Sequence, residues 1–549
     1  MNRLKTLMLP FDVLGPGNRY WLDAFRVDAA IHEFLPLVPL AGVPFPEARA
    51  ALWRDARQTR EKIREGITAS KFPLSSPQKQ ALDEILLPDT LMVATGQQPG
   101  ALGGPLYTFS KILTAVVLAD RLREEWEIPV VPVLWDGGDD HDLPEIDQLI
   151  WNSLEKGNEA FHFGIAEKPG RPAWSVDLET EQLEALKGFL EGVQPQGDYG
   201  RNLIELVSSI WRESTTWCDF YDRFWLRVFE NCPLLVIRPW ERAFRELAVP
   251  ILETEILLPD QSRLDIEATS ELLALAGYKP LIHKSPGTCP FFFIHEGQRL
   301  PVREVGGDLV VEGVLQKSPD RFLQDYQAQP ESLSPNATLR PVVQDAILPT
   351  GATVLGPSEI AYHAQLDRLY RRHGIPRAPI VPRLSMTIAS HAQIHRMEET
   401  GLAWGDLQRD DRELMKRAAA ATDDLSLAQA RLLESQVQEA RSRMIEHLQN
   451  DRKHLVDPVD SQFGRIEKTI QQIQDLIARD IARRDSIRLA RIQNLKNTLY
   501  PDGDLQERIF SLAYFMGKFG QSWVESLIAE SRTWDGKNHI VYIPGEVND

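Results

Sequence analysis

A dense group of acidic side chains stands beside one histidine in the 549-residue chain. Its members are Asp136, Asp139, Asp140, His141 and Asp142. Carboxylates at this spacing repel one another unless a cation or a polar ligand compensates their charge. We therefore expect a functional site here, with Asp140, His141 and Asp142 as its catalytic candidates.

Two other interpretations of this acidic segment stay open. Asp140 and Asp142 would favour the dipole of a helix that begins there, in which case the segment is a solvated helix start. A metal site is also possible, but the sequence shows no second, spaced ligand group beside His141, so we assign no metal ligand.

A glycine-rich loop lies upstream, between Thr95 and Thr108. Its glycines let a ligand approach the backbone closely, and a helix expected to begin near Pro105 directs its free N–H groups into the same space. A phosphate or a carboxylate is favoured there. The loop matches neither a P-loop nor a dinucleotide fingerprint, so an ordinary tight turn remains the alternative. The candidate ligand-binding residues are Gly96, Gln97, Gln98, Gly103, Gly104, Tyr107, Thr108 and Lys111.

Two later segments carry further polar candidates. The first contains Asn336, Arg340 and Gln344, close to a short apolar run. In the second, a Gly-Pro turn leads into a helix that presents Glu359 and Tyr362 on about one face. Glu359 is suited to bind an amine, although a simple capped helix explains the same spacing nearly as well.

The elements expected to position these residues form a β-α-β unit. A strand over Leu91–Ala94, a helix from Leu106 to about Glu125 and a strand over Val130–Trp135 predict a parallel sheet covered by helices. Ligands bind beyond the carboxyl ends of such strands, which is where the glycine loop and the acidic segment fall. Four more apolar runs are predicted as strands, namely Pro233–Ile237, Pro341–Val343, Thr353–Leu355 and Pro379–Val381.

The core is expected over residues 1–385, with α/β insertions at about 150–230 and 280–330. Residues 1–88 are predicted to be mainly helical, with a polar helix through Ala51–Gly66. Within the insertions, Ala160–Leu178 and Gly287–Val314 are predicted to be β-rich, the latter with a turn at Gly306-Gly307.

A coiled-coil arm is expected over residues 386–505, because apolar residues between Asp423 and Tyr500 recur in steps of three and four. A break at Asn450–Ser461, which contains Pro458, predicts an antiparallel hairpin whose second helix runs from Phe463 to Leu499. We expect its apolar stripe to meet a second copy of the chain in a homodimer; folding back onto the core is the alternative. Residues 506–549 are expected to dock on the core through one helix that includes Ile509–Trp523.

Charge and cysteine content exclude several classes of function. The formal charge of −18 argues against nucleic acid or an anionic membrane as the main partner. The apolar stretches are shorter than the roughly 18 residues that a spanning helix needs, and we find no signal peptide, so a cytoplasmic protein is expected. The three cysteines form no C-x-x-C or Cys/His cluster, which argues against a disulfide framework or a cysteine-built zinc site.

Several motifs, taken in order, resemble those of the bacillithiol biosynthesis cysteine-adding enzymes. They are Gly96-Gln97-Gln98, Gly104-Pro105-Leu106-Tyr107-Thr108 with Lys111, Trp135 to Asp142, Ser334-Pro335-Asn336 with Arg340-Pro341 and Gln344-Asp345, and Gly356-Pro357 with Glu359-Ile360-Ala361-Tyr362. The resemblance covers essentially the whole chain, including the arm and Leu505-Gln506-Glu507-Arg508. The chain departs from the family pattern at Asp136, Asp139, Leu355 and Ser358, which affects the expected shape of the pocket more than the reaction.

The resemblance implies a Rossmann-type core related to class I cysteinyl-tRNA synthetases and a helical arm that mediates dimerisation. It implies that Gly96, Gly103, Gly104, Thr108 and Lys111 belong to a nucleotide-binding turn. Arg383 would stand where the synthetases carry a mobile phosphate-binding loop. Substrate contacts would come from Gln97, Gln98, Tyr107, Trp135, Asp139, Asn336, Arg340, Gln344, Glu359 and Tyr362.

The implied reaction is the last step of bacillithiol synthesis, in which the carboxyl of L-cysteine is joined to the amine of glucosaminyl-malate. A free carboxylate is a poor electrophile, so we expect ATP as co-substrate, with Mg²⁺ only as its counter-ion. Two other functions remain open: a nucleotide- or sugar-binding scaffold without ligase activity, and a glycosyl- or nucleotidyltransferase that acts without cysteine.

Overall fold

The computed structural model describes residues 5–14, 17–26, 29–153, 156–193, 197–414, 425–484 and 486–544. These residues form two compact units, which we call the core and the arm. The core extends to Thr387 and resumes over Glu507–Tyr542, whereas the arm is mainly Ile388–Gln506. Part of the predicted arm, 415–424, and the end of the predicted tail, 545–549, lie outside the described residues.

The core is built on a five-stranded parallel sheet in the order β13-β12-β2-β3-β6, which confirms the predicted sheet. Its strands are β2 (Leu91–Gln97), β3 (Val130–Asp136), β6 (Leu235–Ile237), β12 (Thr350–Leu355) and β13 (Ile380–Pro382). The register pairs Leu91 with Val130 and Gln97 with Asp136, so β2 and β3 end at the same edge of the sheet.

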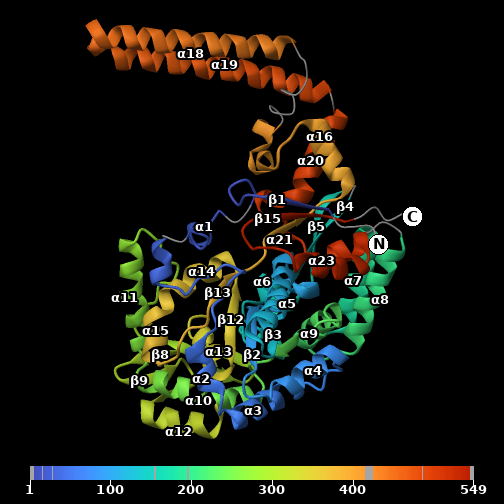
Figure 1. Ribbon diagram of the computed structural model, residues 1–549, viewed down its shortest axis with the longest axis vertical. Coiled ribbons are helices and arrows are strands. Elements are labelled where there is room, and N and C mark those ends of the chain that lie inside the picture. The colour runs from blue at the N-terminus through green and yellow to red at the C-terminus, as the bar shows by residue number, and fades with distance from the viewer. Residues whose placement is uncertain are drawn as a thin grey trace. The chain divides into compact units, whose positions relative to one another are not determined.

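Helices cover both faces of this sheet (Figure 1). On one face, α5 (Leu106–Trp126) packs against β2, β3 and β12, as predicted for the β-α-β unit. On the other face, Met92 and Ala94 of β2 point into a buried cluster that includes residues of α3 (Arg57–Thr68), α10 (Arg242–Leu257) and α13 (Arg340–Ile347). Because alternate residues of a strand face opposite sides, a strand covered on both sides must be apolar throughout.

The loop between β2 and α5 needs glycine for a steric reason. Gly103 has a φ of +87°, in the left-handed region, and a Cβ placed on it would lie 2.7 Å from the ring of Phe224. Phe224 belongs to α9 (Trp217–Val228), which packs directly on this loop. Gly103 therefore allows the loop and α9 to come into close contact.

Two insertions interrupt the sheet. The one between β3 and β6 contains α6 (Leu143–Ile146), the hairpin of β4 (Gln148–Ser153) and β5 (Gly157–His162), α7 (Thr180–Val193), α8 (Asp198–Arg212) and α9. The one between β6 and β12 contains α10, α11 (Gln261–Leu275), α12 (Pro319–Ala328), α13 and a second sheet. The strands of that sheet are β7 (Thr288–His295), β8 (Gln298–Val305), β9 (Asp308–Val311), β10 (Leu315–Lys317) and β11 (Leu333–Pro335).

The prediction of a β-rich Gly287–Val314 with a turn at Gly306-Gly307 is confirmed, since that turn joins β8 to β9. The prediction for Ala160–Leu178 is correct only as far as His162, because two short 3-10 helices follow. Pro341–Val343 is not a strand but lies in the first turns of α13. Proline fits the first turn of a helix, where no backbone donor is needed, and the two valines face the core.

The N-terminal region is mainly helical, as predicted, with α1 (Arg19–Asp23), α2 (Glu47–Trp53), α3 and α4 (Ser76–Glu84), but β1 (Lys5–Leu9) is a strand. The predicted helix over Ala51–Gly66 is wrong, because α2 ends at Trp53 and α3 begins at Arg57. The buried Arg60 guanidinium donates to the Trp53 carbonyl and thereby stabilises this break.

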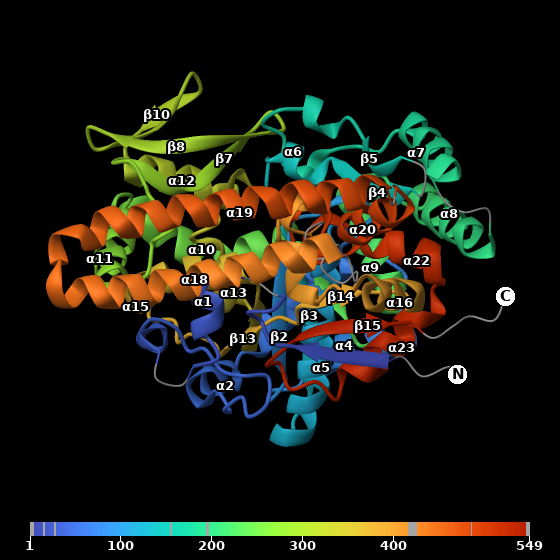
Figure 2. The ribbon, with the colours of Figure 1, turned by 90° about the horizontal axis from the view of Figure 1, so that it is seen from above.

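The arm contains α16 (His391–Thr400) and a hairpin of α18 (Leu425–Asp451) and α19 (Val456–Arg484), followed by α20 (Ser486–Leu499). Figure 2 shows α18 and α19 side by side. Arg441 of α18 binds both Asp460 and Glu467 of α19, which confirms the antiparallel hairpin. The turn is shorter than predicted, because Pro458 lies in the first turn of α19. The predicted second helix corresponds to α19 and α20, and residue 485 between them lies outside the described residues.

The C-terminal part of the core contains α21 (Gln506–Ile509), α22 (Leu512–Phe519), α23 (Ser522–Ser531) and β15 (His539–Ile543). One helix was predicted over Ile509–Trp523, but Gly520, with a φ of +80°, ends α22. Helix α22 packs on α8, and β15 lies between β1 and β14 (Met386–Ile388). Residues from the two ends of the sequence thus complete the core.

Candidate active site

A cavity of about 650 Å³ opens where the carboxyl ends of β2 and β3 meet. Gly96 of β2 is paired with Trp135 of β3, so the glycine loop and the acidic segment leave the sheet side by side. The sequence candidates that line the cavity are Gly96, Gln97, Gln98, Tyr107, Lys111, Trp135, Asp139, Asp140, His141, Asn336, Arg340, Glu359, Tyr362 and Arg383. The fold therefore brings together candidates from five separate segments of the sequence.

Five candidates do not line this cavity. They are Gly103, Gly104, Thr108, Asp142 and Gln344. Gly103 packs against α9, and Thr108 is fully buried next to Gly104. Asp142 is exposed, and Gln344 accepts a hydrogen bond of 3.0 Å from Arg340. Gly103 therefore serves packing against α9, and Gln344 supports Arg340, which does line the cavity.

A buried ion pair lies at the end of the glycine loop. The Lys111 ammonium of α5 is 2.5 Å from Glu359 of α14 (Pro357–His363), and it donates to Gln97 Oε1 at 2.8 Å and to the Gly96 carbonyl at 3.0 Å. Burial lowers the pKa of Lys111, and Glu359 opposes this shift. Glu359 also accepts from the Gly356 N–H at 2.8 Å, so it caps α14 as well as pairing Lys111.

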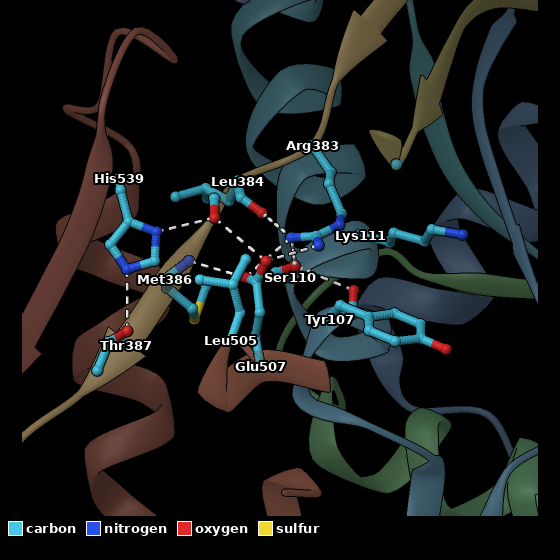
Figure 3. A network of polar contacts seen from close by, with 12 residues as sticks. Tyr107, Ser110, Lys111, Arg383, Leu384, Met386, Thr387, Leu505, Glu507 and His539 are labelled. Atoms are coloured by element: carbon cyan, nitrogen blue, oxygen red, sulfur yellow. Dashed lines mark hydrogen bonds and ion pairs between the residues drawn. The ribbon is translucent and has the colours of Figure 1, made fainter. Parts of the chain in front are cut away.

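A second buried ion pair joins Arg383, the residue after β13, to the C-terminal part of the core (Figure 3). Arg383 donates to both carboxylate oxygens of Glu507, at 2.7 and 2.9 Å, and its guanidinium lies 5.6 Å from the centre of the Tyr107 ring. Burial raises the pKa of Glu507, but the charge and hydrogen bonds of Arg383 outweigh burial and hold that pKa below its usual value. Arg383 is thus positioned and largely neutralised by Glu507.

Sequence reasoning missed Arg299, which comes from β8 in the second insertion. Its guanidinium lies 3.1 Å from Nδ1 of His141, donates to Ser334 Oγ at 2.8 Å and stacks 4.0 Å from the centre of the Phe292 ring. Because a guanidinium can only donate, Nδ1 accepts, and the neutral imidazole carries its proton on Nε2. Burial and the charge of Arg299 lower the pKa of His141, while Asp140 and Asp142 oppose that shift.

Asp139 and Asp140 have different surroundings. Asp139 is buried and forms an ion pair with Arg245 of α10. Asp140 is more exposed; it accepts a hydrogen bond from Gln98 at 2.7 Å, and Arg299 lies 3.8 Å away. Asp139 is therefore already neutralised by the protein, whereas Asp140 presents a hydrogen-bonded carboxylate to the cavity.

Asp136 lies behind the cavity, beside a second buried acid, Asp222 of α9. Burial raises the pKa of Asp136 to about 7 and that of Asp222 well above its usual range, although Arg238 opposes both shifts. Arg238 lies 3.4 Å from Asp222. Two adjacent buried carboxyls cannot both ionise cheaply, so they hold a proton between them.

The described residues contain no cluster of three or more histidine, cysteine, aspartate or glutamate side chains arranged to hold a metal ion. Cys218, Cys232 and Cys289 are buried and unpaired with one another. Within the described part of the chain, no helix has the length and apolar character needed to cross a membrane.

Two family models match the chain in succession. Residues 45–384 match the N-terminal Rossmann-like domain of bacillithiol biosynthesis BshC, and residues 386–543 match its C-terminal coiled-coil domain. The chain belongs to the bacillithiol biosynthesis BshC family. Most cavity residues of this BshC-family chain fall in the first match, while Arg508 comes from the second.

Similar curated proteins carry the name "Putative cysteine ligase BshC". The protein from Bacillus mycoides strain KBAB4 is 27% identical over 466 residues, which cover 82% of this chain and 85% of the relative. Those from Bacillus cereus strain ATCC 10987 and Bacillus thuringiensis strain Al Hakam are each 26% identical, with the same coverage. The BshC match confirms the predicted family and the predicted Rossmann-type core with a coiled-coil arm.

Proposed function

We propose that this chain joins the carboxyl of L-cysteine to the amine of glucosaminyl-malate through an amide bond, the last step of bacillithiol biosynthesis. Its membership of the BshC family and the name of its relatives support a cysteine ligase. The observation that carries the proposal is the cavity at the ends of β2 and β3. It offers carboxylates for an amine and basic side chains for anions, and its size suits small-molecule substrates.

ATP is the proposed co-substrate, because the cysteine carboxylate needs a better leaving group. Attack of a carboxylate oxygen on the α-phosphorus releases pyrophosphate and leaves a cysteinyl adenylate. The sugar amine then attacks the carbonyl carbon, loses a proton and expels AMP. Tyr107, Lys111 and Arg383 at the glycine-loop side of the cavity are the proposed nucleotide-side residues. Lys111 and Arg383 keep one carboxylate partner each, so they would hold phosphate as parts of hydrogen-bonded networks.

Asp140 is the proposed group that binds the sugar amine and accepts its proton. Its carboxylate faces the cavity and is oriented by Gln98 and by the backbone N–H of His141, at 2.7 and 2.8 Å. His141 has its Nδ1 occupied by Arg299, so Nε2 acts as a hydrogen-bond donor rather than as a base. A donor beside Asp140 is suited to the carbonyl oxygen that gains negative charge during amine attack.

The test is an assay of the purified full-length protein with cysteine, glucosaminyl-malate and ATP. Mass spectrometry should detect bacillithiol with equimolar AMP and pyrophosphate. Product formed without nucleotide would refute adenylation but keep the ligase, whereas binding of all substrates without turnover would favour a scaffold. Modification of the sugar without cysteine would favour a transferase. In cells, deletion of the gene should abolish bacillithiol and cause glucosaminyl-malate to accumulate.

A homodimer formed through the arm is part of the proposal. Several apolar side chains of α19 remain exposed on the hairpin, including Ile466, Ile473 and Leu476. Ile466 and Ile473 are three or four positions from the buried Ile470, so they belong to the same face of α19 and form the exposed border of its apolar stripe. An apolar stripe that the hairpin only partly covers is suited to pack against another copy.

A further inference from the structure

Lys284 differs from the other basic residues that line the cavity. It lies in the connection between α11 and β7, on the side of the cavity formed by the second insertion. The second insertion also lines the cavity with Cys289, Phe291, Phe292, Pro301 and Val302. Burial lowers the pKa of Lys284 to about 8, with no contribution from a nearby charge. Lys284 is half-buried, so it has lost part of its hydration without gaining an anion.

The remaining cavity cations already have partners within the protein. Lys111 is paired with Glu359, Arg383 with Glu507, and Arg340 donates to Gln344. Arg299 donates to Ser334 and to the Pro335 carbonyl, and Arg508 also has a contact. In the part of the chain that the structure describes, Lys284 is the cavity cation with no hydrogen bond or ion pair. It is therefore the cation best placed to receive an anionic group of a substrate.

The proposed reaction leaves few choices for that anion. The cysteine carboxylate loses its charge when it is activated, and the nucleotide phosphates are assigned to the glycine-loop side. The two carboxylates of the malyl group keep their charge throughout and take no part in bond formation. We infer that Lys284 binds a malyl carboxylate of the acceptor and thereby selects malyl-substituted glucosamine over plain glucosamine. The inference rests on the proposed function.

Partial burial of Lys284 strengthens this contact. An ion pair shielded from water is stronger than an exposed one, and a bound carboxylate would restore the charged form that burial disfavours. Above about pH 8 the free protein loses the Lys284 proton, so affinity for the malyl acceptor should fall there. Affinity for an acceptor without carboxylates should not change with this ionisation.

The experiment compares two acceptors, glucosaminyl-malate and methyl glucosaminide, in the wild type and in Lys284→Met. For glucosaminyl-malate, KM should rise about 10- to 100-fold in the variant, the range expected for loss of a charge-assisted hydrogen bond, with little change in kcat. For methyl glucosaminide, and for cysteine and ATP, KM should be unchanged. Lys284→Arg should restore most of the preference for glucosaminyl-malate over methyl glucosaminide. The loss of affinity for glucosaminyl-malate at alkaline pH should then occur at higher pH than in the wild type. Lys279→Met, an exposed lysine in the same connection, is the matched control.

Calorimetric binding of both acceptors separates this inference from the proposed function, since it needs no turnover. If the wild type makes no amide but Lys284→Met still loses its preference for glucosaminyl-malate in binding, the ligase assignment fails and the subsite stands. If the wild type is active and Lys284→Met and Lys284→Gln, both folded by thermal melting, keep the wild-type preference, Lys284 does not bind the malyl group.

Discussion

The guanidinium of Arg299 lies 3.1 Å from Nδ1 of His141, although the two residues are 158 positions apart. This contact fixes which ring nitrogen can carry the proton. It also places a permanent positive charge beside an imidazole that burial already keeps neutral.

Replacing Arg299 should change the pKa of His141. In the wild type the pKa of His141 is lowered, so the ring stays neutral until the pH falls below its ordinary value of about 6.5. In Arg299→Met the lowering by Arg299 is lost, so the pKa of His141, followed by NMR titration of the ring, should rise. Arg303→Met, on an exposed position of the same strand, is the control. A pKa of His141 that is the same in Arg299→Met and in the wild type would show that Arg299 does not act on the ring.

Replacing His141 should distinguish a donor from a base. His141→Gln keeps an N–H donor at a position similar to Nε2, whereas His141→Phe removes it. We expect kcat to fall by about 10²-fold or more in the Phe variant and by clearly less in the Gln variant. Equal losses in both would mean that the ring acts as a base after all. KM values for the three substrates measured alongside would reveal a binding defect.

Loss of Glu507 should destabilise the core strongly. Glu507→Gln leaves the buried Arg383 without its counter-charge, and breaking such a pair costs about 3–5 kcal/mol. The pKa of Glu507 is lowered in the folded state, so its contribution is present above about pH 4.5 and is lost as the pH falls further. Urea unfolding gives the free energy of unfolding of both proteins at pH 7 and pH 4. The loss in Glu507→Gln relative to wild type should be smaller at pH 4. Exposed Glu530→Gln is the control, and an equal effect in both variants would contradict the prediction.

The Asp136–Asp222 pair should make stability depend on pH in the opposite direction. The folded core keeps the protons of this pair to a higher pH than the unfolded chain does. Their contribution to the free energy of unfolding is therefore full below about pH 4 and declines as the pH rises toward 7. Between pH 4 and pH 8 the free energy of unfolding of Asp136→Asn should rise by about 1–4 kcal/mol relative to that of the wild type. Exposed Asp89→Asn should show no such gain, and a parallel pH profile for both variants would rule out a shared proton.

The arm should set the oligomeric state. Ile473 and Leu476 have exposed fractions of 41% and 63% on the hairpin, so they contribute little to its own packing. The double variant Ile473→Glu, Leu476→Glu should shift the protein from dimer to monomer in size-exclusion chromatography with light scattering. Lys468→Glu, an exposed charge change on the same helix, should leave the dimer intact. A dimer that survives the double variant would place its interface elsewhere.

The sequence predicted the elements whose pattern is local. Strands β2 and β3 and helix α5 are contiguous, strongly apolar and separated by glycines, so their positions and the edge where they end could be predicted. Pro341–Val343 was misassigned because three apolar residues fit a short strand and the inner face of a helix equally well. The break before Arg57 depends on Arg60 and Trp53 packing together, which no local pattern reveals.

The same distinction between local patterns and distant contacts applies to the residues of the candidate site. Residues at strand ends and in glycine turns stand out in the sequence, and most of them line the cavity. Arg299, Arg245 and Lys284 come from the second insertion, where nothing in the neighbouring sequence marks them. Their importance depends on which side chain each one meets across the cavity, and that is fixed only by the complete fold. The roles assigned to all these residues stay predictions until the variants are measured.

The pairing of Arg383 with Glu507 has a consequence for synthesis on the ribosome. The two residues are 124 positions apart, and the whole arm is translated between them. At about 5–20 residues per second, Glu507 follows Arg383 by roughly 6–25 s. During this interval the nascent core has a guanidinium to bury and no carboxylate to neutralise it. We therefore expect the core to reach its final packing only after the arm has been translated. The time needed to translate the arm then sets a minimum time for folding of the core.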